Sequence, residues 1–164
     1  MQTRAMIATH PIKLHRSEAL LHAIEAAIAC AQTCTSCADC CLAEEMVAEL
    51  RRCIRLNLDC ADICATAAAV GIRQTSANSE ILDVLFDACV VVCRACAEEC
   101  ERHAAQHEHC QICAEACRQF MRACDASIPS CPAEWRISSP YESNESPEAR
   151  SADAEPPDGW RGGC

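Results

Sequence analysis

The sequence predicts an all-α protein, an antiparallel up-and-down four-helix bundle with a cysteine-lined core. Between Ser17 and Cys131 the only glycine is Gly71 and the only proline is Pro129, and the residues around the cysteines favour helices. The chain holds 18 cysteines, and most of them recur here at steps of three and four residues. Such steps place successive thiols on one face of a helix.

The phase of the cysteines shows where one helix must end and the next begin. On one continuous helix, with about 100° per residue, the second cysteine array would lie roughly 120° to 160° away from the first. We therefore expect a break near residues 43–46. A further phase change of about 100° separates the third array from the fourth and places a turn within residues 102–109.

Capping residues place the remaining turn after Gly71, where Asn78 or Ser79 can cap the third helix and Glu80 lies in its first turn. Together these signals predict four helices, over residues 17–43, 46–70, 79–104 and 108–128. Short connections favour antiparallel neighbours, so the four cysteine arrays should share one interior. The turn near Met46 and the histidine-rich turn should then lie at the same end and form a mouth.

The flanking segments differ in composition from this region. We expect an N-terminal arm over residues 1–16, a bundle domain over residues 17–131, and a disordered tail rich in proline, serine and glutamate over residues 132–164. Neither an export signal nor an apolar stretch of about 20 residues is recognised. We therefore expect a cytoplasmic protein without a membrane partner, in a compartment that keeps thiols reduced.

The net charge of the chain and the soft character of thiolate sulfur limit the kinds of partner and metal that the protein can bind. The formal net charge of −10 argues against nucleic acid as a partner. Reduced cysteine can serve as a small apolar core residue, but cores normally draw their volume from larger aliphatic side chains. Thiolates select Cu(I), zinc or iron–sulfur clusters. Buried zinc tetrathiolate sites would accumulate negative charge, whereas monovalent Cu(I) replaces one thiol proton per ion, so we expect several Cu(I) ions per chain.

The segments that contain the four cysteine arrays resemble those of one known protein family. The segments CAQTCTSCADCCLAEE, CIRLNLDCADICATAA and CVVVCRACAEECERHAAQHEHCQICAEACRQF are similar to the cytosolic branch of the four-helix-bundle copper storage proteins, over residues 17–131. The resemblance implies that core cysteines bind many Cu(I) ions, that histidines near one open end assist their passage, and that the protein is a homotetramer. The metal ligands that it implies are Cys30, Cys34, Cys37, Cys41, Cys53, Cys60, Cys64, Cys89, Cys93, Cys96, Cys100, Cys110, Cys113, Cys117 and Cys124.

Five further residues complete the expected site. Cys40 is expected to flank the mouth and Cys131 the opposite end, while His103, His107 and His109 are expected to guard the mouth. The leading hypothesis is storage and buffering of Cu(I), exchanged with an unidentified copper donor or acceptor and requiring no enzymatic step. The alternatives are a zinc or iron–sulfur protein that uses selected groups of four cysteines, and a redox protein that cycles disulfides.

Overall fold

The computed structural model describes residues 2–12, 17–76 and 79–127, and their regular secondary structure is helical. The five helices are α1 (Gln2–Thr9), α2 (Glu18–Ala43), α3 (Arg51–Gly71), α4 (Ser79–His103) and α5 (Glu108–Ser127). The prediction of an all-α protein is confirmed. The tail over residues 132–164, Cys131 and the expected cap Asn78 lie outside the described residues.

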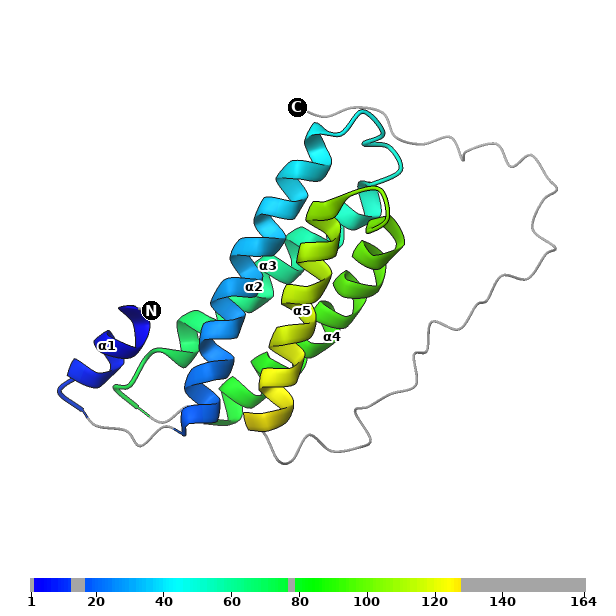
Figure 1. The fold of residues 1–164 in the computed structure, drawn as a ribbon. Coiled ribbons are helices and arrows are strands. Elements are labelled where there is room, and N and C mark those ends of the chain that lie inside the picture. Colours follow the sequence, from blue (N-terminus) through cyan, green and yellow to red (C-terminus); the bar gives the residue numbers. More distant parts are fainter. Residues whose placement is uncertain (1, 13–16, 77–78, 128–164) are drawn as a thin grey trace, which may run out of the picture. The chain divides into compact units, whose positions relative to one another are not determined.

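Helices α2 to α5 correspond to the four helices expected from the cysteine phase. Helix α2 packs on α3 and α5, and α4 packs on the same two helices, so each has two neighbours (Figure 1). The chain runs in opposite directions along successive helices (Figure 1). Contacts between the end of α2 and the start of α5, and between the start of α2 and Gly71 at the end of α3, agree with this arrangement.

Helix α2 begins and ends within one residue of its expected bounds, whereas α3 starts later than expected. The Ser17 hydroxyl accepts a hydrogen bond from the Leu20 amide at 3.1 Å and caps α2. The expectation that the next helix begins at residue 46 is wrong, because α3 begins at Arg51. Residues 44–50 form turns instead, including a 2.9 Å bond from the Glu49 amide to the Met46 carbonyl.

Helix α1 was not predicted and replaces part of the expected N-terminal arm. The Arg4 guanidinium pairs with Glu18 at 2.6 Å and with Glu25 at 2.9 Å, both on α2. The Gln74 side chain donates to the carbonyl of Ile7 at 2.9 Å. These polar contacts join residues that are far apart in the sequence. They could not be predicted from the eight-residue α1 segment, which buries no residue.

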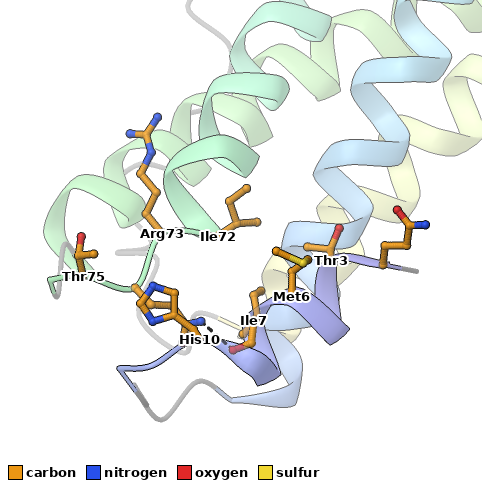
Figure 2. Close-up of a pocket in the computed structure, with 9 residues that line it drawn as sticks. Thr3, Met6, Ile7, His10, Ile72, Arg73 and Thr75 are labelled. Carbon is orange, nitrogen blue, oxygen red and sulfur yellow. Dashed lines mark hydrogen bonds between the residues drawn. The ribbon is translucent and has the colours of Figure 1, made fainter.

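A cavity of about 550 Å³ lies between α1 and the segment that follows α3 (Figure 2). Met6 and Ile7 from α1 face Ile72 and Arg73 across it, and Thr3, His10 and Thr75 also line it. No cysteine is among its lining residues. The cavity is thus separate from the thiol core.

Helix α2 also corrects the expectation that the chain lacks a membrane-length apolar stretch. Among the described residues it is the single helix long and apolar enough to cross a bilayer, judged by length and composition alone. Alanine and cysteine give it this composition, and its buried face carries Cys30, Cys34, Cys37 and Cys41 against the neighbouring helices. The same test is passed by core helices of soluble proteins.

The core is closed at the end of the bundle that contains Gly71. Phe86 and Phe120 are fully buried and meet edge to face with ring centroids 6.0 Å apart. A Cβ atom at Gly71 would lie only 2.8 Å from Cγ1 of buried Ile24. Glycine at this position allows α3 to approach α2 closely.

Candidate metal centre

Fifteen of the sixteen cysteines in the described residues are buried, and they come from all four long helices. Cys40 is partly exposed, and Cys131 cannot be placed because it lies beyond the described residues. The buried cysteines are Cys30, Cys34, Cys37 and Cys41 of α2, Cys53, Cys60 and Cys64 of α3, Cys89, Cys93, Cys96 and Cys100 of α4, and Cys110, Cys113, Cys117 and Cys124 of α5.

The inner part of the core is a continuous group of sulfurs around Cys30. Its Sγ lies 3.9 Å from those of Cys34 and Cys60, and 3.7 Å from those of Cys93 and Cys117. These partners belong to α2, α3, α4 and α5 respectively. Thiols far apart in the sequence therefore meet in one interior, as their helical phase predicts.

Neighbouring groups of sulfurs share members. Cys60 and Cys117 complete one set with Cys30 and Cys93, and another with Cys34 and Cys96, and within each set the sulfurs lie within 4.8 Å of one another. Towards the other end, Cys37 and Cys110 likewise belong to two sets, one with Cys41 and His109 and one with Cys53 and Cys100. The geometry suits bridging thiolates better than separate closed sites, because a closed site needs four ligands of its own.

Asn57 lies among the sulfurs at the position where its helix would otherwise present another thiol. It is fully buried, and its amide nitrogen donates to Cys53 Sγ at 3.3 Å and Cys37 Sγ at 3.5 Å. Its carbonyl oxygen accepts from Cys113 at 2.9 Å and from Cys96 at 3.3 Å. The amide nitrogen of Asn57 therefore faces two sulfurs that accept a hydrogen bond, and its carbonyl oxygen faces two thiols that donate one.

A polar cluster covers the other end of the core, where the turn after α2 meets the start of α5. Glu44 Oε1 lies 3.0 Å from Nδ1 of His107 and 3.2 Å from Nε2 of His109. The second ring nitrogen of His109, Nδ1, lies 3.5 Å from the sulfurs of both Cys37 and Cys110. The prediction that the two turns meet at one end is confirmed, and we call Glu44, His107 and His109 the mouth cluster.

The structure pairs His103 with a carboxylate on its own helix. Its Nε2 lies 3.4 Å from Glu99, a side chain only 6% exposed that also pairs with Arg52 at 3.1 Å and Arg102 at 3.0 Å. Met46 lies on the turn after α2 and is 55% exposed. His107 and His109 are thus brought together, with ring centroids 5.3 Å apart, whereas His103 belongs to a separate ion-pair network.

Two thiols near the mouth cluster, those of Cys41 and Cys110, have a raised pKa, because burial in an apolar environment disfavours the thiolate. At Cys53 a hydrogen bond with Cys100 lowers the pKa, but the bond with Cys37 and burial outweigh it and bring the pKa to about 11. These thiols are therefore protonated in the metal-free protein near neutral pH, and a soft cation has to displace their protons.

For His109, which lies beside these thiols, hydrogen bonds affect the pKa more than burial does. Burial lowers the pKa of His109, but its hydrogen bonds with Cys37 and Glu44 outweigh burial and raise it. The bond with His109 also lowers the pKa of Glu44. The Glu44 carboxylate and the sulfurs thus contact opposite nitrogens of the same imidazole.

The sequence carries a signal for Asn57 but none for Glu44, which sequence reasoning missed. Asn57 could be found because it falls on the helical face defined by Cys53 and Cys60. Glu44 is one of several acidic residues in its turn, and nothing in its spacing distinguishes it from Glu45. Its role depends on a contact across 65 residues with His109, which only the folded chain reveals.

Comparisons with known proteins agree with this geometry. The copper storage protein family matches residues 16–129. The structure of the copper storage protein Ccsp from Streptomyces lividans, loaded with 10 copper equivalents, is 44% identical, with a TM-score of 0.72 over 77% of this chain and 99% of that one. The Cu(I)-bound copper storage protein BsCsp3 is 35% identical, with a TM-score of 0.58 over 67% of this chain and 98% of that one.

A further Streptomyces lividans structure, which describes copper loading to a cytosolic copper storage protein, is 48% identical, with a TM-score of 0.66 over 69% of this chain and 94% of that one. The uncharacterized cysteine-rich protein YhjQ of Bacillus subtilis is 39% identical over 74 residues, which are 45% of this chain and 63% of that protein. The chain thus spans less than two thirds of the length of this curated relative.

Proposed function

The chain belongs to the copper storage protein family, and we propose that it stores and buffers many Cu(I) ions on the thiols that line α2 to α5, which act as a four-helix storage bundle. The observation that carries this proposal is the sharing of sulfurs between neighbouring groups. Cu(I) is soft and monovalent, and bridging thiolates let one sulfur serve two ions. A row of overlapping sulfur sets therefore provides capacity rather than one defined site.

The charge of the core favours Cu(I) over zinc. Among the described residues the buried polar or charged side chains are Asn57, Gln74 and Glu99, so no buried cation is present to offset zinc tetrathiolates. Each such centre would carry two excess negative charges in an apolar interior, which is costly. A Cu(I) ion that replaces a thiol proton leaves the charge of the core unchanged.

We propose all the buried cysteines of the described residues as storage ligands, with Cys40 and Cys131 as flanking candidates. His107 and His109 are proposed to pass copper between solvent and the sulfurs at the mouth, with His103 in support. Holding and releasing an ion requires no bond making in a substrate, so the proposal assigns no catalytic residue. Redox cycling, the alternative, predicts specific disulfides between core thiols.

The setting of this function is also proposed. A cytosolic location is supported by the cytosolic Streptomyces lividans relative, and a copper donor or acceptor in the same compartment is required. Assembly as a homotetramer is supported by exposed Ile81, Val84 and Val91, which recur on one side of α4 at helical spacing. Sedimentation analysis measures the assembly, and a monomer at all concentrations would contradict it.

Anaerobic titration of the reduced, metal-free protein with Cu(I), followed by competition with a Cu(I) chelator, tests the storage function. We expect well over four tightly held ions per chain, with little change in helix content because the bundle is already folded. Saturation at one or two ions would contradict storage. Rapidly reducible disulfides in the metal-free protein would instead support redox cycling.

A further inference from the structure

We infer that Glu44 is a positioning residue that fixes the tautomer and orientation of His109, so that the ring nitrogen that faces the mouth sulfurs carries no proton. The inference rests on the proposed storage function and assigns a role to a residue that no cysteine or histidine pattern identifies. It follows from two contacts of the same ring, Nε2 to Glu44 Oε1 at 3.2 Å and Nδ1 to Cys37 Sγ at 3.5 Å.

The tautomer follows from the donor capacity of the groups. An ionised carboxylate only accepts hydrogen bonds, and a neutral imidazole carries a single N–H. The proton of His109 therefore lies on Nε2 and is donated to Glu44. Nδ1 is left unprotonated, and it faces the sulfurs of Cys37 and Cys110 at 3.5 Å and that of Cys41 at 3.9 Å.

This arrangement completes a ligand set. Nδ1 of His109 and the sulfurs of Cys37, Cys41 and Cys110 lie within 4.8 Å of one another, so an unprotonated Nδ1 adds a nitrogen ligand to three sulfurs. The opposite tautomer would direct an N–H at the same sulfurs and remove that ligand. A carboxylate on the distal nitrogen is the usual means of fixing a ligating histidine.

The same oxygen also holds His107. Its Nδ1 lies 3.0 Å from Glu44 Oε1, so in the neutral ring Nδ1 donates and Nε2 keeps the lone pair. Glu44 thus selects different ligating nitrogens in the two rings, Nε2 in His107 and Nδ1 in His109. Because Glu44 directly follows α2, while His107 immediately precedes α5 and His109 lies in its first turn, one side chain orders the mouth across two helices.

The metal-free protein tests the tautomer directly. Long-range proton–nitrogen correlation spectra of the reduced, nitrogen-15-labelled full chain, at an alkaline pH where imidazole is neutral, should show His109 protonated on Nε2 and unprotonated on Nδ1. In Glu44→Ala we expect this preference to be lost. Glu45→Ala is the matched control, because Glu45 is the adjacent, exposed carboxylate, and it should keep the wild-type spectrum.

Stopped-flow mixing with a Cu(I) complex supplies the second readout. We expect Glu44→Ala to slow uptake of the first equivalents about tenfold, as is typical when a carboxylate behind a metal ligand is removed. Its helix content should match that of wild type and of Glu45→Ala. A role limited to holding the fold would change helix content and leave the tautomer of the remaining folded protein as it was.

The inference is overturned if wild-type His109 carries its proton on Nδ1, a result that needs no variant and stands even if Glu44→Ala folds poorly. It is also overturned if Glu44→Ala keeps the Nε2 tautomer and loads at the wild-type rate. Failure of storage gives a different result, namely a copper count of one or two in wild type and variants alike, whatever the tautomer.

Discussion

At one end of the bundle two phenylalanines close the core, with Phe86 and Phe120 in edge-to-face contact and Ile24 against Gly71. At the other end, polar side chains cover the sulfurs, with Glu44, His107 and His109 linked by hydrogen bonds. The thiol core continues between them, with Asn57 inside it. We propose a division of work between the two ends, in which the closed end contributes free energy of folding and the mouth controls the passage of copper.

Truncation of the closed end should have the largest effect on stability. Phe120→Ala removes a fully buried ring and leaves a cavity, so we expect a loss of about 3–5 kcal/mol in the free energy of unfolding. Urea unfolding of the reduced, metal-free protein measures it. Ile112→Ala on the exposed side of the same helix is the control, with an expected change within about 0.5 kcal/mol.

The same variant distinguishes the roles of the two ends. Copper uptake by folded Phe120→Ala should keep its wild-type rate at low temperature. Faster uptake would show that copper also passes through the phenylalanine end, and it would contradict the division of work.

Asn57 offers the next largest effect and tests the middle of the core. Asn57→Ala removes a buried amide that serves sulfurs on α2, α3, α4 and α5, so we expect a loss of about 1–3 kcal/mol in the free energy of unfolding. Urea unfolding measures this change, and Asn57→Cys adds a complementary test by restoring a small polarisable group. An unchanged unfolding midpoint in Asn57→Ala would show that these sulfur contacts contribute nothing to stability.

Acid should weaken copper binding at the mouth. Burial raises the pKa of Cys41 and Cys110, so Cu(I) must displace protons there, and affinity falls as the pH is lowered. If each ion displaces one proton, affinity changes about tenfold, or about 1.36 kcal/mol, per pH unit. Chelator competition across a pH series measures this slope. A flat profile between neutral and mildly acidic pH would mean that the thiols are already ionised in the metal-free protein.

The smallest effect is expected at the closed end, from Gly71→Ala. Alanine favours a helix by about 1 kcal/mol over glycine, but its Cβ would press on Ile24, and overpacking of a core costs about 1–3 kcal/mol. We expect a net loss of about 1 kcal/mol, measured by urea unfolding. The double variant with Ile24→Val provides the check, because a smaller partner should relieve part of the loss. A stabilised Gly71→Ala would show that the approach of α3 to α2 is looser than described.

The sequence predicted the arrays more fully than the ends of the bundle. The helical phase of the cysteines depends only on the regular turn of a helix, so it predicted the bounds of α2, α4 and α5 closely. It also predicted that the arrays share one interior, where Cys30 meets Cys60, Cys93 and Cys117. Helix α1 is held by contacts such as that of Arg4 with Glu25, which have no periodic signal, and the turns over residues 44–50 that delay the start of α3 have none either. Glu44 was missed for the same reason.

The distribution of copper in crystals of the loaded protein, located by anomalous scattering at the copper edge, tests the central claim most directly. The account predicts more than four ions per chain, bridged by sulfurs from α2 to α5 and continuous from the Cys30 group to the mouth cluster. One or two isolated ions, or copper held mainly outside the thiol core, would contradict it.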